Sequence, residues 1–206
     1  MTIHMGMSGK LIFKENHYHN KHLRIEFVFS KEYVLEFIDI RKFGKSRIWK
    51  CQEELLPRLG PEPLDSQIVF HSLQILKTNR PVKSVLLDQS VIAGIGNIYA
   101  DESLFKAGIH PLTACSQIDP VKLKRLSQEI PRVLKSAIQN MGTTISQYRP
   151  PNQLQGKNQY YLKVYGLTGK ACRKCGTLIT RIKINGRSSH FCPKCQPEPE
   201  AISINT

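Results

Sequence analysis

The sequence lacks the features that place a chain in or across a membrane. No stretch approaches the roughly 20 consecutive apolar residues that a membrane-spanning helix requires. The first seven residues, MTIHMGM, contain no basic segment followed by an apolar run, so no secretory signal is visible. Repeats and low-complexity blocks are also missing, and 40% apolar with 22% charged residues is an ordinary globular mix. These absences exclude a fibrous or wholly disordered chain and predict a folded cytoplasmic protein.

Acidic residues are scarce relative to basic ones. Thirty Lys and Arg residues against sixteen Asp and Glu residues give a formal net charge of +14. Such an excess of positive charge favours a polyanionic partner, with nucleic acid as the first candidate. An anionic membrane surface is the competing partner, but it usually binds a basic amphipathic helix with aromatic anchors, and none stands out here.

The six cysteines are unevenly distributed. Cys51 and Cys115 are isolated and are expected to be buried thiols rather than reactive ones. The other four follow the pattern C-x2-C-x16-C-x2-C and are Cys172, Cys175, Cys192 and Cys195. Each C-x-x-C pair places two thiolates on one tight turn, so two pairs can close a tetrahedral site around Zn²⁺. Two disulfides, or a redox C-x-x-C motif, are the alternative interpretations.

The sixteen residues between the cysteine pairs predict a β-hairpin. Residues 178–184 and 187–191 are strand-like, and Asn185-Gly186 between them is a strong signal for a type I′ turn. Such a hairpin returns the second cysteine pair to the first and gives a zinc ribbon that the metal stabilises. Residues 170–196 hold seven Lys or Arg residues and no acidic residue. A finger of this charge more often binds phosphate than presents a merely solvated face, and Arg187 lies beside the turn, where it can enter a nucleic-acid groove.

Outside the finger, the sequence pattern predicts strands in the N-terminal part of the chain and helices after them. Alternation of apolar and polar residues predicts strands at 23–27 and 34–40, and Gly60-Pro61-Glu62-Pro63 predicts a hinge. Capping signals and helical periodicity then predict four helices and a later strand. The helices span about 65–77, 83–88, 97–107 and 120–141, and the strand spans 160–165.

A glycine turn separates the second and third predicted helices. Gly94 and Gly96 let the backbone approach a ligand closely, and the helix that starts at Asn97 directs free N–H groups outward. This combination binds anions, and Lys83 lies just upstream. Tight packing of two helices explains the same glycines about as well.

Together these motifs resemble those of a known family. The run GIGNIYADE at residues 94–102 closely resembles the helix-two-turn-helix of bacterial formamidopyrimidine-DNA glycosylases, and GRSSHFC at residues 186–192 resembles their C-terminal zinc finger. The sister group, endonuclease VIII, fits less well. Other segments follow the family's order and spacing, namely HMGMSG at 4–9, DIRKFG at 39–44 and LGPEPL at 59–64. The resemblance covers residues 1 to about 196.

The resemblance implies an α+β fold with four parts. These are a partial N-terminal β-sandwich (1–60), a helix-two-turn-helix domain (61–150), a lesion-capping loop with the zinc finger (151–196) and a disordered tail (197–206). It also implies a base-excision repair enzyme that removes oxidised purines such as 8-oxoguanine through a Schiff base and then cleaves the abasic strand by β,δ-elimination. The implied partner is double-stranded DNA containing oxidised bases or abasic sites. The expected state is a zinc-containing monomer at the bacterial nucleoid, without a membrane partner.

Three residues match the family's set that fills the space left by a flipped nucleotide. They are Met7, Arg41 and Phe43. Apolar wedges of this kind hold open an unstacked base step, and base flipping is required for chemistry on a base inside a duplex. Without the resemblance, core packing would be the preferred explanation of Met7 and Phe43.

Other positions match the family's contacts to the DNA backbone. His22 and Arg41 match DNA contacts, whereas Lys83 and Asn97 are similar to phosphate-binding positions around the lesion. Arg187 matches the finger arginine that grips the phosphate and is assigned the δ-elimination step.

The N-terminus departs from the family pattern. In the family, an N-terminal proline attacks the sugar, the adjacent glutamate donates a proton, and a lysine before the first of these segments assists. This chain has no proline before Pro57 and no glutamate before Glu15. We therefore expect an N-terminally truncated glycosylase that lacks its Schiff-base nucleophile, acid and lysine. The alternatives are a catalytically inactive zinc-dependent module that binds damaged DNA and a zinc-ribbon RNA-binding protein.

Overall fold

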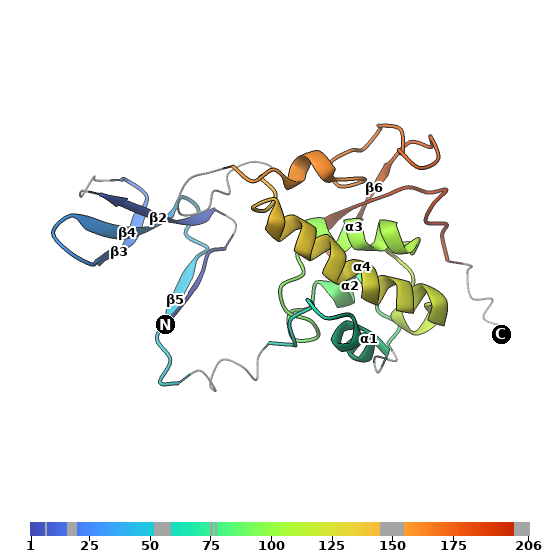
Figure 1. The fold of residues 1–206 in the computed structure, drawn as a ribbon, viewed down its shortest axis with the longest axis horizontal. Coiled ribbons are helices and arrows are strands. Elements are labelled where there is room, and N and C mark those ends of the chain that lie inside the picture. Colours follow the sequence, from blue (N-terminus) through green and yellow to red (C-terminus); the bar gives the residue numbers. More distant parts are fainter. Residues whose placement is uncertain are drawn as a thin grey trace. The chain divides into compact units, whose positions relative to one another are not determined.

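A computed structural model describes residues 1–6, 8–15, 20–51, 59–74, 76, 78–144 and 155–199. The chain divides into two compact units, residues 1–55 with 137–161 and residues 56–136 with 162–206. Strands build the first unit, and helices with a C-terminal hairpin build the second, so the predicted α+β class is confirmed (Figure 1). Within the described ranges, none of the helices combines the length and the apolar character needed to cross a bilayer.

The first unit contains two antiparallel sheets. One has the strand order β2-β4-β3, and the other pairs β1 with β5. The strands are β1 (Thr2–His4), β2 (Gly9–Glu15), β3 (Leu23–Val28), β4 (Tyr33–Asp39) and β5 (Lys45–Arg47). The hydroxyl of Ser30 accepts hydrogen bonds from the N–H groups of Glu32 and Tyr33, both at 3.2 Å, and closes the turn between β3 and β4. The strands predicted at 23–27 and 34–40 are therefore confirmed.

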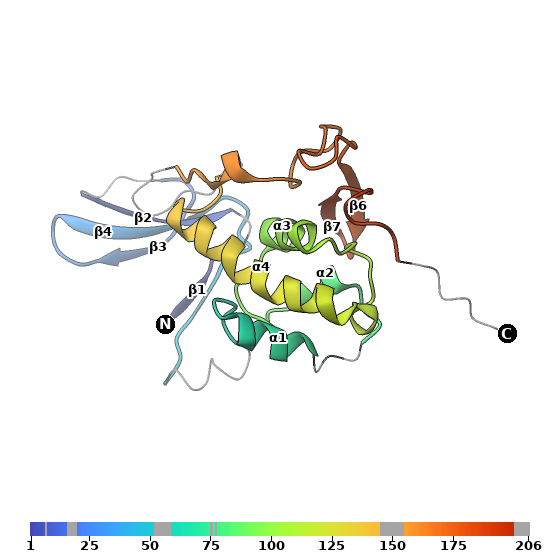
Figure 2. The same ribbon diagram turned by 45° about the vertical axis from the view of Figure 1, so that its right-hand side comes forward.

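The second unit is organised around an apolar core to which four helices contribute. They are α1 (Ser66–Gln74), α2 (Val82–Leu86), α3 (Asn97–Ala107) and α4 (Pro120–Gln139), which continues into the first unit from Ala137. Each helix contributes fully buried leucine or valine side chains to this core, among them Leu73, Leu86, Leu104 and Leu126. Figure 2 shows α4 running past α2 and α3.

Two carboxylates cap helices close to the helix starts that the sequence predicts. Asp65 accepts hydrogen bonds from two backbone N–H groups in the first turn of α1, at 2.7 and 3.1 Å. Asp119 does the same at the start of α4, at 2.9 and 3.1 Å, ahead of Pro120. The predicted helix at 97–107 is confirmed with the same bounds. Lys77, the predicted end of the first helix, lies outside the described residues.

The C-terminal segment forms the predicted hairpin but not the predicted strand. β6 (Thr180–Ile184) pairs with β7 (Arg187–Phe191), and Asn185 and Gly186 adopt φ values of 45° and 78°, as a type I′ turn requires. The strand predicted at 160–165 is wrong, because Asn158–Tyr161 form the 3-10 helix η4 and residues 162–165 join no sheet. The backbone N–H groups of residues 163–165 bind a buried carboxylate instead of a neighbouring strand.

Candidate metal centre and nucleic-acid interface

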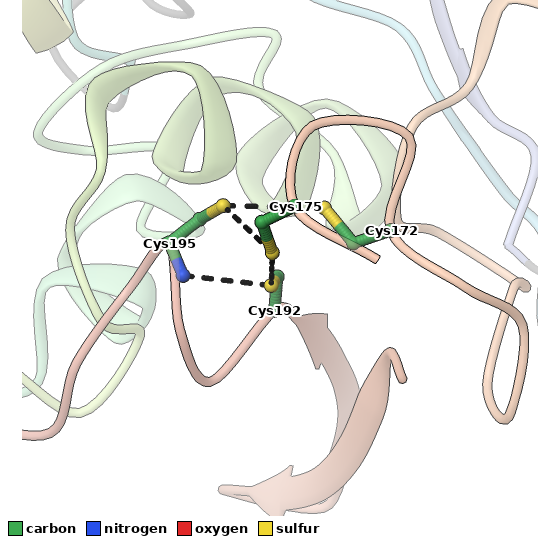
Figure 3. Close-up of side chains that lie close together, drawn as sticks. All are labelled: Cys172, Cys175, Cys192 and Cys195. Atoms are coloured by element: carbon green, nitrogen blue, oxygen red, sulfur yellow. Dashed lines mark hydrogen bonds between the residues drawn. The ribbon is translucent and has the colours of Figure 1, made fainter. Parts of the chain in front are cut away.

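The four predicted cysteines converge on one point of the finger (Figure 3). Their sulfurs all lie within 4.8 Å of one another, with Cys175 Sγ at 3.4 Å from Cys192 Sγ and at 3.5 Å from Cys195 Sγ. Four sulfurs placed tetrahedrally at 2.3 Å from a central ion would be about 3.8 Å apart. A disulfide would need a sulfur separation of about 2.05 Å, and all four cysteines are free. The geometry therefore fits a shared divalent cation and not two disulfides.

Backbone turns hold each cysteine pair in place. The N–H groups of Lys174 and Cys195 point at the sulfurs of Cys172 and Cys192, at 3.4 and 3.5 Å. Gln196 is fully buried, and its side chain accepts from the Cys192 N–H at 3.0 Å and donates to the Ile109 carbonyl, just past α3, at 2.8 Å. These bonds help to orient the sulfurs of Cys172 and Cys192 within the two turns.

The electrostatics of the cluster also favour a cation. The hydroxyl of Thr177 lowers the pKa of the Cys175 thiol to about 6. Burial, by contrast, raises the pKa of the Cys195 thiol to about 12. Four adjacent thiolates repel one another in a partly buried site, so a divalent cation is needed to hold all of them deprotonated together.

Asp101 on α3 docks the hairpin onto the helices. Its carboxylate is fully buried and binds the Lys83 ammonium group from α2. It also accepts from the Ser189 hydroxyl at 3.0 Å and from the His190 N–H at 2.8 Å, both on β7. One carboxylate therefore joins α2, α3 and the finger. Burial lowers the pKa of Lys83, and the charge of Asp101 counters this effect.

The two predicted phosphate ligands, Lys83 and Asn97, both bind the finger. The Lys83 ammonium donates to the Ser188 carbonyl at 2.8 Å, and the Asn97 amide donates to the same oxygen at 3.0 Å. The Lys83 side chain has no exposed surface. The structure therefore gives both residues a role in holding the segment next to Arg187, and their phosphate contacts stay a prediction.

Arg187 itself is exposed at the first position of β7. It lines a pocket of about 240 Å³ together with Arg80 and Lys83 from the segment around α2 and Asn185 from the turn. Asn185 is held there because its side chain donates to the Ser84 hydroxyl at 2.9 Å. The tip of the finger is thus fixed on both sides of Arg187 while the guanidinium stays accessible.

Glu102, the neighbour of Asp101, anchors the segment that leads into the finger. Its Oε1 accepts from the N–H groups of Lys163, Val164 and Tyr165 at 2.9 to 3.0 Å. We expect Glu102→Ala to lower the free energy of unfolding by on the order of 2 kcal/mol, because the buried Val164 N–H loses its acceptor. Urea unfolding followed by circular dichroism measures this loss.

Glu102→Gln is the matched control for this prediction. Its carbonyl oxygen can keep the three N–H groups bonded, so it should be clearly more stable than Glu102→Ala. Burial raises the pKa of Glu102, so from about pH 4.3 up to the raised value the folded chain binds more protons than the unfolded chain. Wild-type stability should fall as pH rises through that window, and the Gln variant should not show this fall. Equal losses for Ala and Gln would contradict the role of the acceptor.

The predicted void-filling residues belong to the first unit. Arg41 and Phe43 are both exposed, and the Arg41 guanidinium lies 5.4 Å from the centre of the Phe43 ring. His22 is half-buried at the turn before β3, and its carbonyl accepts from the Asp39 N–H. Met7 lies outside the described residues. The exposure of Phe43 argues against core packing as its explanation.

The predicted lesion-capping loop is described only at its ends. The Asn158 amide donates to the Thr143 hydroxyl at 2.8 Å, and the Gly156 N–H donates to the Thr144 hydroxyl at 3.0 Å. Residues 145–154 lie outside the described part, as do residues 200–206 of the predicted tail. The proposed role of the loop stays a prediction.

Sequence reasoning missed the buried polar residues that hold the finger in the second unit and the loop after β4 in the first. Asp101, Glu102, Gln196 and Asp39 are each at most 3% exposed and bond to segments far along the chain or to tight loops. One sequence feature could have indicated these buried acids, namely the pair Asp101-Glu102 within a helix that is otherwise rich in apolar residues.

Three family models match consecutive parts of the chain. The formamidopyrimidine-DNA glycosylase N-terminal domain matches residues 1–46, the formamidopyrimidine-DNA glycosylase H2TH domain matches 59–149, and the zinc finger found in FPG and IleRS matches 169–197. The last match covers all four cysteines, so the metal of the cluster is zinc, as predicted.

Curated relatives and solved structures agree with these models. The formamidopyrimidine-DNA glycosylase of Crocosphaera subtropica is 42% identical over 96% of this chain and 73% of its own length. Lactococcus lactis Fpg bound to DNA with an abasic site is 34% identical with a TM-score of 0.84, over 95% of this chain and 74% of that one. MutM (Fpg) of Thermus thermophilus is 38% identical with a TM-score of 0.83, over 96% and 75%. A Lactococcus lactis mutant was solved with DNA containing Fapy-dG, at 35% identity and a TM-score of 0.84, with the same coverage as the abasic complex.

Proposed function

The chain belongs to the formamidopyrimidine-DNA glycosylase family, and from this membership we propose that it is a base-excision repair glycosylase and AP lyase. Its substrate would be duplex DNA that carries an oxidised purine or an abasic site. In the family's reaction an N-terminal proline supplies the amine that forms a Schiff base at the sugar C1′ as the damaged base leaves, and β,δ-elimination then cleaves the abasic strand. The chain includes Arg187, which matches the arginine of the second step, but it has no proline before Pro57. Relatives solved with abasic and Fapy-dG DNA support this choice of substrate.

The observation that carries the proposal is the presentation of Arg187. Bonds from Asn185 to Ser84 and from Lys83 to the Ser188 carbonyl hold both sides of this residue, and zinc holds the base of the hairpin. A guanidinium presented from a backbone held on both sides can match the fork geometry of a phosphate group. The net charge of +14 supplies the general attraction to DNA.

Binding and covalent trapping together test the function. We expect tighter binding to duplexes with 8-oxoguanine or a stable abasic analogue than to the undamaged duplex. Borohydride reduction during incubation traps a Schiff base as a covalent complex, and trapping would support the glycosylase and lyase chemistry. Lesion-selective binding without trapping would support the inactive damaged-DNA-binding module. Equal affinity for damaged and undamaged duplexes would contradict both.

Arg187→Ala should weaken binding to the abasic duplex by about tenfold or more, because a hydrogen bond to a charged group contributes ~1.5–3 kcal/mol. The slope of log affinity against log salt should fall by about one. Fluorescence anisotropy at several salt concentrations measures both quantities, and the thermal unfolding midpoint should change little.

Arg181→Ala is the matched control for Arg187→Ala. Arg181 is an exposed cation of the same hairpin, on β6, and its removal subtracts the same charge. Its effect should be clearly smaller. Equal effects of the two substitutions would show that Arg187 contributes only to the general positive charge.

A further inference from the structure

A buried carboxylate at the end of β4 braces the loop that presents Arg41 and Phe43. Asp39 is 1% exposed. Its Oδ1 accepts from the Ser8 hydroxyl and from the Arg41 N–H at 3.2 Å, and its Oδ2 accepts from the Gly44 N–H at 2.7 Å. The Arg41 N–H also donates to the Ser8 oxygen at 3.1 Å. One side chain thus closes the loop of residues 40–44, here called the wedge loop, and ties it to Ser8.

Steric contacts lock the same arrangement. A Cβ added at Gly44 would lie 2.4 Å from the Phe37 ring and 3.1 Å from Asp39 Oδ2. Gly6 has a φ of 60°, and a Cβ added there would lie 2.9 Å from the Phe43 carbonyl carbon. Gly6 therefore packs directly on the backbone of the wedge loop, with no room for a side chain at either glycine.

The hydrogen bonds around Asp39 also keep it ionised. The Ser8 hydroxyl and then the Gly44 N–H hold the pKa of Asp39 below its ordinary value. At neutral pH the carboxylate is therefore an acceptor at both oxygens, which suits a ring of donors.

We propose that Asp39 is a positioning residue that orients Arg41 and Phe43 to fill the space left by a flipped nucleotide. Through Ser8 the brace extends to the residue that precedes β2. Because Asp39 is buried, it acts through the wedge loop and does not touch DNA. The inference rests on the proposed function, since it requires a duplex with a flipped or missing base.

Asp39→Asn tests the proposal with almost no change in size. The amide replaces one acceptor by a donor that faces an N–H or O–H group, so the wedge loop should lose its fixed geometry. The readout is the ratio of the affinity for an abasic-analogue duplex to the affinity for the undamaged duplex. The fluorescence of 2-aminopurine placed opposite the abasic position reports in addition whether the void is filled. We expect the ratio to fall about tenfold. Affinity for the undamaged duplex should stay nearly constant, because the net positive charge that dominates it does not fall.

A double-mutant cycle separates positioning from general destabilisation. If Asp39 acts through the wedge loop, Asp39→Asn should cost clearly less in the Arg41→Ala background than in the wild-type chain, with the remaining cost due to Phe43. Asp65→Asn, which weakens a helix cap in the second unit, should leave the ratio unchanged. Ser8→Ala should reproduce part of the loss and serves as the test variant if Asp39→Asn does not fold.

The outcomes for the proposal and for the function are distinct. A folded Asp39→Asn variant that keeps the wild-type ratio, or an effect that adds fully to Arg41→Ala, overturns the positioning role alone. A wild-type chain without any preference for the abasic duplex overturns the proposed function, and the positioning role falls with it.

Discussion

Replacing Cys175 by alanine is expected to abolish zinc binding, unfold the finger and remove most of the affinity for abasic DNA. The apolar cluster of the finger contains few fully buried residues besides its cysteines, namely Val164 and Ile179. A core of this size does not support a stable hairpin, whereas zinc binding to finger peptides contributes about 10–16 kcal/mol at neutral pH. Metal analysis of the purified variant and fluorescence anisotropy with an abasic duplex measure the two losses.

Cys51→Ala is the control for this substitution, because Cys51 lies outside the zinc site. The expectation that Cys51 is buried is wrong, since it is exposed, whereas Cys115 is buried as expected. The Cys51→Ala variant should retain one equivalent of zinc and wild-type affinity. Chelation of zinc from the wild-type chain should reproduce the Cys175→Ala result. DNA affinity that survives complete removal of zinc would show that the finger folds, or the duplex binds, without the metal.

The zinc finger and the starts of the longer helices were predictable because their determinants are local. The spacing of the cysteines and the Asn185-Gly186 turn specify a hairpin within about 25 residues of sequence. The caps at Asp65 and Asp119 act over two or three residues. Physical rules that operate within one turn or one hairpin can be applied to a single sequence without knowledge of the fold.

The buried charges were not predictable because their partners lie far away in the sequence. A Lys or Asp in a helix is expected at the surface unless it is paired. The partners of Asp101 on β7 are nearly ninety positions away, at Ser189 and His190. The wrong strand at 160–165 has the same origin, because Glu102 satisfies the N–H groups that a strand would pair. Only the assembled fold shows which groups meet.

Lys83 is the residue for which the family resemblance and the structure suggest different roles. The resemblance assigns Lys83 to a phosphate contact, whereas the structure buries its ammonium group against Asp101. We expect Lys83→Met to lower the free energy of unfolding by ~3–5 kcal/mol, since it leaves the buried Asp101 carboxylate without its cation. The salt dependence of DNA binding should keep its slope under conditions where the variant is folded. A phosphate ligand would instead change that slope by about 0.9 per contact and leave stability nearly intact. Urea unfolding and anisotropy titrations over a range of salt concentrations measure the two quantities.

Two controls make this prediction specific to the buried pair. Lys106→Met removes a partly exposed ammonium 3.8 Å from the Glu129 carboxylate and should cost less than about 1 kcal/mol. The double substitution Lys83→Met with Asp101→Asn should be more stable than Lys83→Met alone, because a neutral amide tolerates the loss of the cation. If Lys83→Met leaves stability unchanged and reduces the salt slope by about one, Lys83 reaches the phosphate and the buried pair is not what fixes the finger.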